Sequence, residues 1–204
     1  MRKLTANTFL SVDGVMQAPG GPGEDDDGGF AYGGWSFHYW DDRMGTLMGE
    51  VMAEPFDLVL GRRTYDIFAA HWPHSTDDEA AGPLNNATKY VASRGKPDLS
   101  WDRSVLLDGD AADSVAALKQ GDGPELQVHG SADLLQTLIR HGLVDEYRIW
   151  TFPVLLGPGK RLFAGGTVAA ALRLVDSTVS TTGVVINTYR PAGELVTGSF
   201  APND

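Results

Sequence analysis

Two short segments of the chain combine residue types that favour a bound phosphate group. In each, an apolar run ends at a glycine and a helical pattern begins directly afterwards: GRRT at residues 61–64 follows FDLVL, and HGSA at residues 129–132 follows ELQV. A helix that starts there offers unpaired backbone N–H groups and the positive end of its dipole. Arg62 and Arg63 add two planar guanidinium groups, each able to bond two phosphate oxygens. Together the junctions favour a dinucleotide over the alternative that the glycines only turn the chain and the arginines pair with surface carboxylates.

Other residue clusters suggest different chemistry, and each has a plainer interpretation. His71, His74, Asp77 and Asp78 form an H-x-x-H pattern with carboxylates, but no third ligand has zincin spacing, so no metal is predicted. His129 and Ser131 lack a G-x-S-x-G context, which favours a structural histidine over hydrolysis. The aromatic cluster Trp35, His38, Tyr39 and Trp40 either stacks on a heteroaromatic ring or packs in the core or at a subunit contact. The chain also lacks the G-x-G-x-x-G and Walker motifs.

The elements that position these residues follow from hydrophobic periodicity. Strands and helices alternate up to Gly142, and the remainder is rich in β-strand patterns. Strands are predicted at 4–12, 56–60, 88–93, 104–107, 125–129, 145–156, 171–180 and 183–191. The strands at 88–93 and 104–107 are expected to be buried. Helices are predicted at 36–54, from about Thr64, at 112–119 with Asp113 or Ser114 as cap, and at 131–142. This order predicts an α/β fold: a mixed, mostly parallel sheet with helices on both faces and a C-terminal antiparallel hairpin.

Residues 17–34, QAPGGPGEDDDGGFAYGG, interrupt this pattern between the first strand and the first helix. So many glycines in one stretch are unsuited to regular structure. The segment is either a solvated surface loop or a mobile lid over a pocket.

Composition excludes several classes of protein. The 204 residues contain 27 Asp and Glu, 16 Lys and Arg and no cysteine, for a net charge of −11. A disulfide scaffold, a cysteine nucleophile and a thiolate zinc site are therefore excluded, and general affinity for nucleic acid or an anionic membrane is disfavoured. With no signal-peptide pattern and no long apolar run, we expect a cytoplasmic protein with one domain at 1–191 and a C-terminal tail at 192–204.

Five segments occur in an order that resembles the dihydrofolate reductase-like family. They are SVDG at 11–14, LVLGRRTYDIFAAHWP at 58–73, YVASR at 90–94, VHGSADLLQTL at 128–138 and FPVLLGPGKRLF at 152–163. The resemblance spans about residues 2–190 and is closest to the branch of the riboflavin-biosynthesis reductase domain and its stand-alone relatives. It implies an eight-stranded mixed sheet with NADPH lying across the carboxyl ends of the central strands.

The resemblance also implies roles for individual residues. Gly61, Arg62, Arg63 and Thr64 would face the 2′-phosphate and pyrophosphate, Ser93 and Arg94 the adenosine end, and Gly130 and Ser131 the pyrophosphate.

The expected function is hydride transfer from NADPH to an electron-poor C=N or C=O of a small pteridine-like or pyrimidine-like heterocycle. Asp13 and Asp41 are the expected catalytic carboxylates, and Trp35 and His38 the expected substrate contacts. Folate is disfavoured because the carboxylates Asp41 and Asp42 near the first helix do not match the family's pterin-binding acid cleanly. A protein that keeps the fold and binds a ligand without turnover is the alternative.

Assembly as a homodimer is expected. The last strands carry more apolar and aromatic side chains than one helix layer needs, and exposed sheet edges are usually covered. The expected interface residues are Tyr147, Trp150, Phe152, Leu172, Leu174, Val184 and Ile186; the alternative is that they pack within their own chain.

Overall fold

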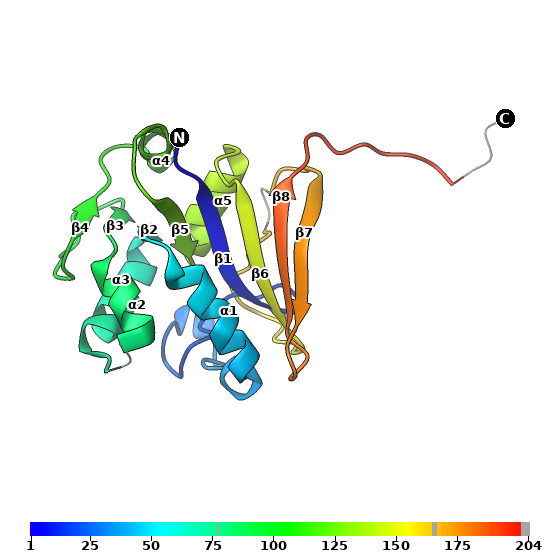
Figure 1. Cartoon of the computed structure of the whole chain (residues 1–204), viewed down its shortest axis with the longest axis horizontal. Coiled ribbons are helices and arrows are strands. Elements are labelled where there is room, and N and C mark those ends of the chain that lie inside the picture. The colour runs from blue at the N-terminus through cyan, green and yellow to red at the C-terminus, as the bar shows by residue number, and fades with distance from the viewer. Residues whose placement is uncertain (77, 165–166, 201–204) are drawn as a thin grey trace.

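The computed structural model describes residues 1–76, 78–164 and 167–200. Eight strands form one sheet in the order β4-β3-β2-β5-β1-β6-β8-β7 (Figure 1). The strands are β1 (Leu4–Ser11), β2 (Phe56–Gly61), β3 (Lys89–Ala92), β4 (Ser104–Leu106), β5 (Glu125–His129), β6 (Glu146–Phe152), β7 (Leu172–Val179) and β8 (Val185–Pro191). The helices are α1 (Asp42–Ala53), α2 (Arg62–His71), α3 (Asp78–Asn86), α4 (Ala111–Gln120) and α5 (Ala132–Arg140), with short 3-10 turns at Asp27–Gly29, Phe37–Tyr39 and Trp72–His74.

The direction of the strands divides the sheet into two parts. From β4 to β6 every neighbouring pair is parallel. Strand β8 then runs antiparallel to β6, and β7 runs antiparallel to β8. The predicted mixed, mostly parallel sheet with a C-terminal antiparallel hairpin is confirmed.

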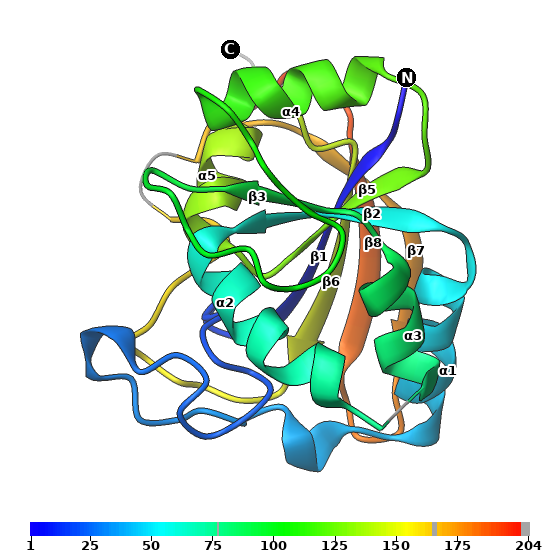
Figure 2. The same cartoon turned by 90° about the vertical axis from the view of Figure 1, so that its left-hand side faces the viewer.

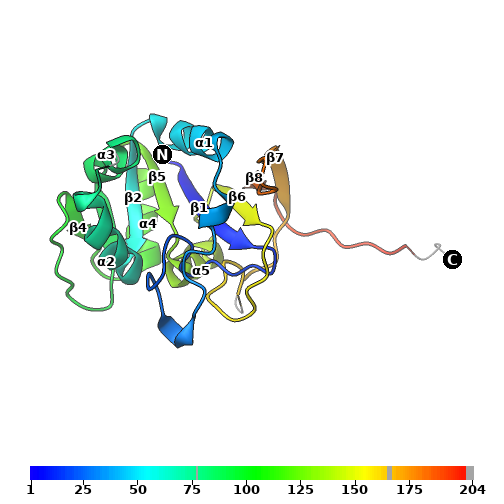
Figure 3. The ribbon, with the colours of Figure 1, turned by 90° about the horizontal axis from the view of Figure 1, so that it is seen from below.

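Helices cover both faces of the sheet, as predicted (Figures 2 and 3). On one face, Val115 of α4 and Leu135 of α5 pack against Leu4 and Ala6 of β1. On the other face, Met44 of α1 packs against Trp150 and Phe152 of β6, while Tyr65 of α2 and Leu84 of α3 close a second cluster over β2. Because side chains alternate along β1, this central strand contributes to both cores.

Three predicted elements differ from the observed ones. The helix expected at 36–54 begins only at Asp42, because Trp40 and Asp41 have extended backbone and the Asp41 carboxylate accepts a hydrogen bond from Met44 N. Helix α4 is capped by Asp110 rather than Asp113 or Ser114, since the Asp110 side chain accepts from Ala112 N and Asp113 N. Strand β4 is an edge strand with exposed Val105 and Leu106 instead of a buried one.

One helix was not predicted. Helix α3 contains Gly82 and Pro83, residues that locally favour a loop. Its Leu84 is buried in the cluster with Phe56 and Tyr65, so tertiary packing outweighs the weak local propensity.

The C-terminal part of the chain corrects one further expectation. Five of the expected interface side chains are buried within the chain's own core, namely Tyr147, Trp150, Phe152, Val184 and Ile186, whereas Leu172 and Leu174 are exposed on β7. Residues 192–200 form no helix or strand and extend away from the body (Figure 1); the rest of the expected tail, 201–204, lies outside the described residues. Within the described part of the chain, no helix is long and apolar enough to cross a membrane.

Candidate functional site

A cleft of about 1140 Å³ opens at the carboxyl ends of β2, β3 and β5. The parallel direction of these strands brings their carboxyl ends to one edge of the sheet, where ligands of open α/β sheets bind. All eight residues expected to bind the dinucleotide line this cleft: Gly61, Arg62, Arg63, Thr64, Ser93, Arg94, Gly130 and Ser131.

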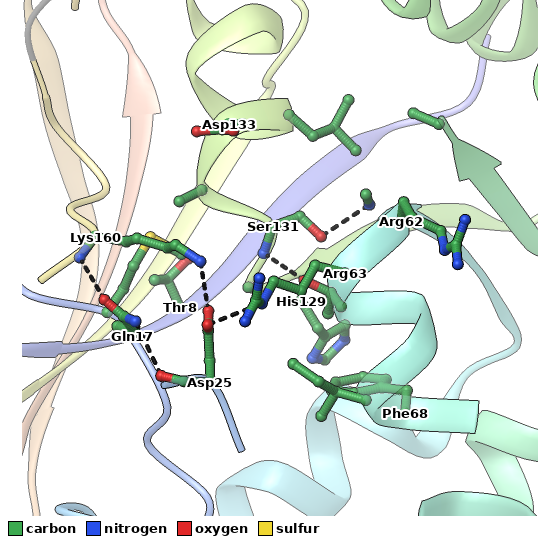
Figure 4. A pocket seen from close by; sticks show the side chains of 18 of the residues that line it. Thr8, Gln17, Asp25, Arg62, Arg63, Phe68, His129, Ser131, Asp133 and Lys160 are labelled. Carbon is green, nitrogen blue, oxygen red and sulfur yellow. Dashed lines mark hydrogen bonds and ion pairs between the residues drawn. The ribbon is translucent and has the colours of Figure 1, made fainter. Parts of the chain in front are cut away.

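The two glycine junctions are bonded directly to each other. Gly61 N donates to Ser131 Oγ at 3.0 Å, and Ser131 N donates to Thr64 Oγ1 at 3.1 Å. Both Gly130 and Ser131 have left-handed backbone, with φ of 65° and 59°, which glycine adopts readily and serine does at a cost. Hydrogen bonds at Ser131 thus join residues about seventy positions apart in the chain (Figure 4).

Helices α2 and α5, which start at the two bonded junctions, differ from α1 and α4 in how their N-termini are capped. The first turns of α2 and α5 line the cleft and have no side-chain cap, whereas aspartates cap α1 and α4. No carboxylate therefore competes as a cap for the N–H groups of α2 and α5. The two adjacent positive helix ends fit the paired phosphates of a dinucleotide.

The three arginines of the cleft have different partners. Arg62 pairs with Asp66 at 2.6 Å on the surface of α2, an exposed contact that a ligand can readily replace. Arg63 pairs with Asp25 at 2.8 Å and with Asp27 at 3.9 Å, so the loop already neutralises the charge expected to face phosphate. Arg94 has no carboxylate within ion-pair distance among the described residues.

The glycine-rich segment forms one wall of the cleft. Its buried Asp25 bridges Arg63 and Lys160, the latter at 2.6 Å. Gln17 Nε2 donates to the backbone oxygens of Asp25 and Asp27 at 2.9 Å, and Lys160 N donates to Gln17 Oε1 at 3.1 Å (Figure 4). The segment lies at the cleft, as expected for a segment that covers a pocket. These bonds hold it to α2 and to the loop after β6.

Asp13 and Asp41, the expected catalytic carboxylates, lie outside the cleft lining. Asp13 accepts from Ser11 Oγ at 2.6 Å, Leu156 N at 3.1 Å and Gly157 N at 2.8 Å; the Ser11 bond, followed by these amides, lowers the pKa of Asp13 to about 2. Asp41 caps α1 and accepts from Thr181 N at 2.7 Å and Thr181 Oγ1 at 2.6 Å. Both carboxylates are engaged in joining turns, a task that local sequence does not reveal.

The expected substrate contacts Trp35 and His38 do not line the cleft either. Trp35 donates to Gln17 O at 2.7 Å and packs edge-on against Phe152, while His38 is exposed on a 3-10 turn. Of the aromatic cluster, Trp40 is the member that reaches the cleft, and its ring stacks on Trp150 at 6.1 Å. Packing is therefore the observed role of Trp35.

Sequence reasoning missed the residues at the other end of the cleft. Phe9, Met48, Met52 and Phe68 provide apolar wall, and Asn7 and Thr8 provide polar atoms. Asn7 Oδ1 and Thr8 Oγ1 are buried and have no hydrogen-bond partner among the described residues, which is uncommon in the middle of a sheet. The signal available in the sequence was the run of polar residues within the first strand, LTANTFLS.

A metal site was the alternative considered for His71, His74, Asp77 and Asp78. The described residues contain no group of three or more His, Asp or Glu side chains that could hold an ion. Of the four residues considered for this alternative, Asp77 lies outside the described residues.

Comparison with known proteins identifies the family. The sequence matches the RibD C-terminal domain family over residues 2–186. Two similar proteins of Bacillus subtilis (strain 168) are uncharacterised. YyaP is 29% identical over 136 residues, 65% of this chain and 72% of YyaP. YwjB is 32% identical over 118 residues, 57% of this chain and 63% of YwjB.

Solved structures agree in fold. A candidate riboflavin biosynthesis protein from Shewanella sp. PV-4 has a TM-score of 0.70 at 20% identity, over 93% of this chain and 99% of its own. A pyrimidine reductase-like protein from Corynebacterium diphtheriae has a TM-score of 0.60 at 14% identity, over 95% and 93% of the two chains. Dihydrofolate reductase from Enterococcus faecalis, solved with NADP(H), has a TM-score of 0.58 at 16% identity, over 93% and 96%.

These structural likenesses establish the fold, and the match over residues 2–186 establishes the family. The chain belongs to the RibD C-terminal domain family, a family of reductases with the dihydrofolate reductase-like fold.

Proposed function

We propose that this protein is an NADPH-dependent reductase that transfers a hydride to a small pteridine-like or pyrimidine-like heterocycle. The observation that carries the proposal is the pair of uncapped helix starts, α2 and α5, joined by the Gly61–Ser131 and Ser131–Thr64 hydrogen bonds at the cleft. Family membership and a fold shared with a dihydrofolate reductase solved with NADP(H) support the same reading.

The cofactor would supply the hydride, and the chain would bind and orient it. The N–H groups at the starts of α2 and α5 would hold the pyrophosphate, with Gly61 and Gly130 allowing close approach. Arg62 and Arg94 are the arginines best placed to hold a 2′-phosphate, since Arg63 is already paired with Asp25.

The opposite end of the cleft suits a planar ring. Phe9 of β1, Trp40 and the methionines Met48 and Met52 of α1 line it. Apolar and polarisable side chains pack against heteroaromatic rings and exclude water from the reacting atoms. The substrate ring would therefore lie between β1 and α1.

Cofactor titration followed by a turnover assay tests the proposal. NADPH should change the tryptophan fluorescence of the protein in a saturable manner, and NADH should bind more weakly. With NADPH bound, pterins, flavin precursors, quinones and nitro compounds are then screened for loss of absorbance at the nicotinamide band. Failure to bind either dinucleotide refutes the proposal.

A non-catalytic ligand-binding protein is the second candidate. It is favoured by one observation: Asp13 and Asp41, the carboxylates expected to act in catalysis, are engaged in turns outside the cleft. NADPH binding without oxidation against the whole panel of acceptors would select this candidate.

A further inference from the structure

Three neutral polar side chains form a row on the sheet beneath α1. Asn7 of β1 and His129 of β5 are partners in the parallel register. Gln127 lies two residues before His129 and therefore on the same face of β5. Asn7 and His129 both line the cleft. Phe9 lies two residues after Asn7 and on the same face of β1, and Gln127 bonds to Val51 O of α1, so the row lies between β1 and α1, where the proposed function places the substrate.

Hydrogen bonds determine which atoms of the row remain available. Gln127 Oε1 accepts from Asn7 Nδ2 at 3.3 Å and lies 2.9 Å from His129 Nε2. Gln127 Nε2 donates to Val51 O of α1 at 3.2 Å and to the Glu125 carboxylate at 3.3 Å. With both Gln127 hydrogens used in this way, its oxygen must be the acceptor, and Asn7 must donate its amide nitrogen.

Asn7 therefore presents its carbonyl oxygen without a donor. The residue is 7% exposed, and Oδ1 receives no hydrogen bond from any described residue. A buried acceptor without a donor is costly, and a ligand N–H that supplies the missing bond recovers that cost on binding.

His129 presents a second acceptor. Burial, and to a smaller extent the positive charge of Arg148, lowers the pKa of His129 to about 4, so the ring is neutral near pH 7. A neutral imidazole that donates from Nε2 to Gln127 leaves Nδ1 as an acceptor. Both cleft-lining members of the row thus offer acceptor atoms and no charge.

The charged groups near the row are already paired. Arg148, opposite Asn7 on β6, is held by Glu125 at 3.3 Å and Glu146 at 3.1 Å and does not line the cleft. Helix α1 contributes Met48 and Met52 to the cleft, and neither can ionise.

The carboxylates that line the cleft come from other segments. Glu24, Asp25 and Asp27 belong to the glycine-rich segment, where Glu24 accepts from Gly20 N and Gly21 N and the two aspartates pair with Lys160. Asp110 caps α4, and Asp133 is exposed in the first turn of α5. No carboxylate of the described residues joins the row from α1 to stabilise a protonated ring.

We propose that Asn7 and His129 select the substrate: a neutral planar heterocycle whose ring N–H or amino group donates to Asn7 Oδ1. A ring that binds through protonation is disfavoured, because the row offers neutral acceptors where such a ring needs a carboxylate. This inference rests on the proposed function, since it assigns the substrate end of the same cleft.

Three probes test the inference on the protein saturated with NADP⁺, which prevents turnover. Lumazine carries ring N–H groups, dimethyllumazine has methyl groups in their place, and diaminopteridine is a ring that protonates readily. Lumazine should bind about tenfold more tightly than dimethyllumazine, which corresponds to one hydrogen bond to a buried acceptor. Diaminopteridine should gain no affinity as the pH is lowered from 8 to 6.

Variants separate the hydrogen bond from steric exclusion by the methyl groups. Asn7→Leu should remove the preference for lumazine over dimethyllumazine, whereas steric exclusion would preserve it. Asn7→Asp should create a preference for diaminopteridine. Asn187→Leu is the matched control, because Asn187 of β8 lies outside the cleft lining and bonds to Tyr189.

The wild-type comparison keeps the test valid even if a variant fails to fold. Equal affinity for the two lumazines, absence of lumazine binding, or tighter binding of diaminopteridine at low pH would each overturn the inference. Failure of the proposed function has a different signature, namely no binding of NADPH or NADP⁺; lumazine selectivity is then measured without cofactor.

Discussion

Arg62 and Arg63 are adjacent in sequence but meet different partners. Arg62 has only a surface pair with Asp66, and Arg94 has no ion-pair partner among the described residues, whereas Arg63 is held by Asp25. Since a charge-assisted bond contributes roughly 1.5–3 kcal/mol, Arg62→Ala or Arg94→Ala should weaken NADPH binding about tenfold and leave NADH nearly unchanged. Arg63→Ala should have the smaller effect.

Fluorescence titration of both dinucleotides measures this difference. Arg140→Ala, at the exposed last turn of α5, is the matched control. An equal loss of affinity for NADPH and NADH would mean that the arginines contact the pyrophosphate instead of the 2′-phosphate.

His129 makes the stability of the protein depend on pH. Its pKa is lowered from 6.5 to about 4 in the folded protein, mainly by burial. As the pH falls below 6.5, the unfolded state takes up a proton and the folded state does not, so stability is lost by up to about 3 kcal/mol on reaching pH 4. More than about one pH unit above 6.5, the ring is neutral in both states and contributes no pH dependence.

Urea unfolding of wild type and His129→Gln between pH 7.5 and 4.5 isolates this effect. The other titrating groups are common to both proteins, so the difference in unfolding free energy reports His129. Parallel pH profiles for the two proteins would contradict a neutral, buried ring.

At the level of secondary structure, Asp25 is the buried carboxylate that holds the segment 17–34 against the rest of the molecule. Asp25 joins the segment to Arg63 of α2 and to Lys160. Asp25→Asn removes the charge from both pairs, so we expect faster amide hydrogen exchange within residues 17–34 and little change in the core strands. Asp26→Asn is the control, because Asp26 is the exposed neighbour. Equal exchange in the two variants would show that the charge of Asp25 does not hold the segment.

The N-terminus of α1 separates a structural role of Asp41 from a catalytic one. Asp41→Ala should lower the urea midpoint, because the bonds to Met44 N and Thr181 are lost. Asp41→Asn should retain most of the stability, since asparagine also caps helices well, and it should retain turnover. If Asp41→Asn is as stable as wild type but inactive, the carboxylate acts in catalysis after all.

For the whole molecule, we expect a homodimer formed through the β7 edge. This terminal strand exposes Leu172, Leu174, Val175 and Val179, with Leu174 55% exposed. Exposed apolar edges usually pair or are covered. Light scattering should give the mass of two chains, and Leu174→Glu should yield monomers that still bind NADPH.

The opposite edge of the sheet provides the control for assembly. Val105 of β4 is 45% exposed, and Val105→Glu should leave the dimer intact. A wild-type mass of one chain would contradict the prediction, and loss of NADPH binding in the Leu174→Glu monomer would mean that the cleft needs both subunits.

The sequence alone determined the features that depend on neighbouring residues. Strand and helix patterns that alternate up to Gly142, followed by strand patterns alone, predicted the mixed sheet. The glycine junctions of two helices, with the parallel order of their strands, placed residues 61–64 and 129–132 at one cleft. Such signals are local, because a strand or helix start is defined within a few residues.

Only the tertiary structure decided the partners of individual side chains. Asp25 meets Arg63 and Lys160, Asp13 meets the amides of Leu156 and Gly157, and Asn7 meets Gln127. Each pair joins residues that are far apart in the chain, and nothing in the local pattern distinguishes a carboxylate that holds a turn from one that faces a ligand. The physical reason is that the role of a polar side chain depends on the donors and charges that folding brings within about 3 Å of it.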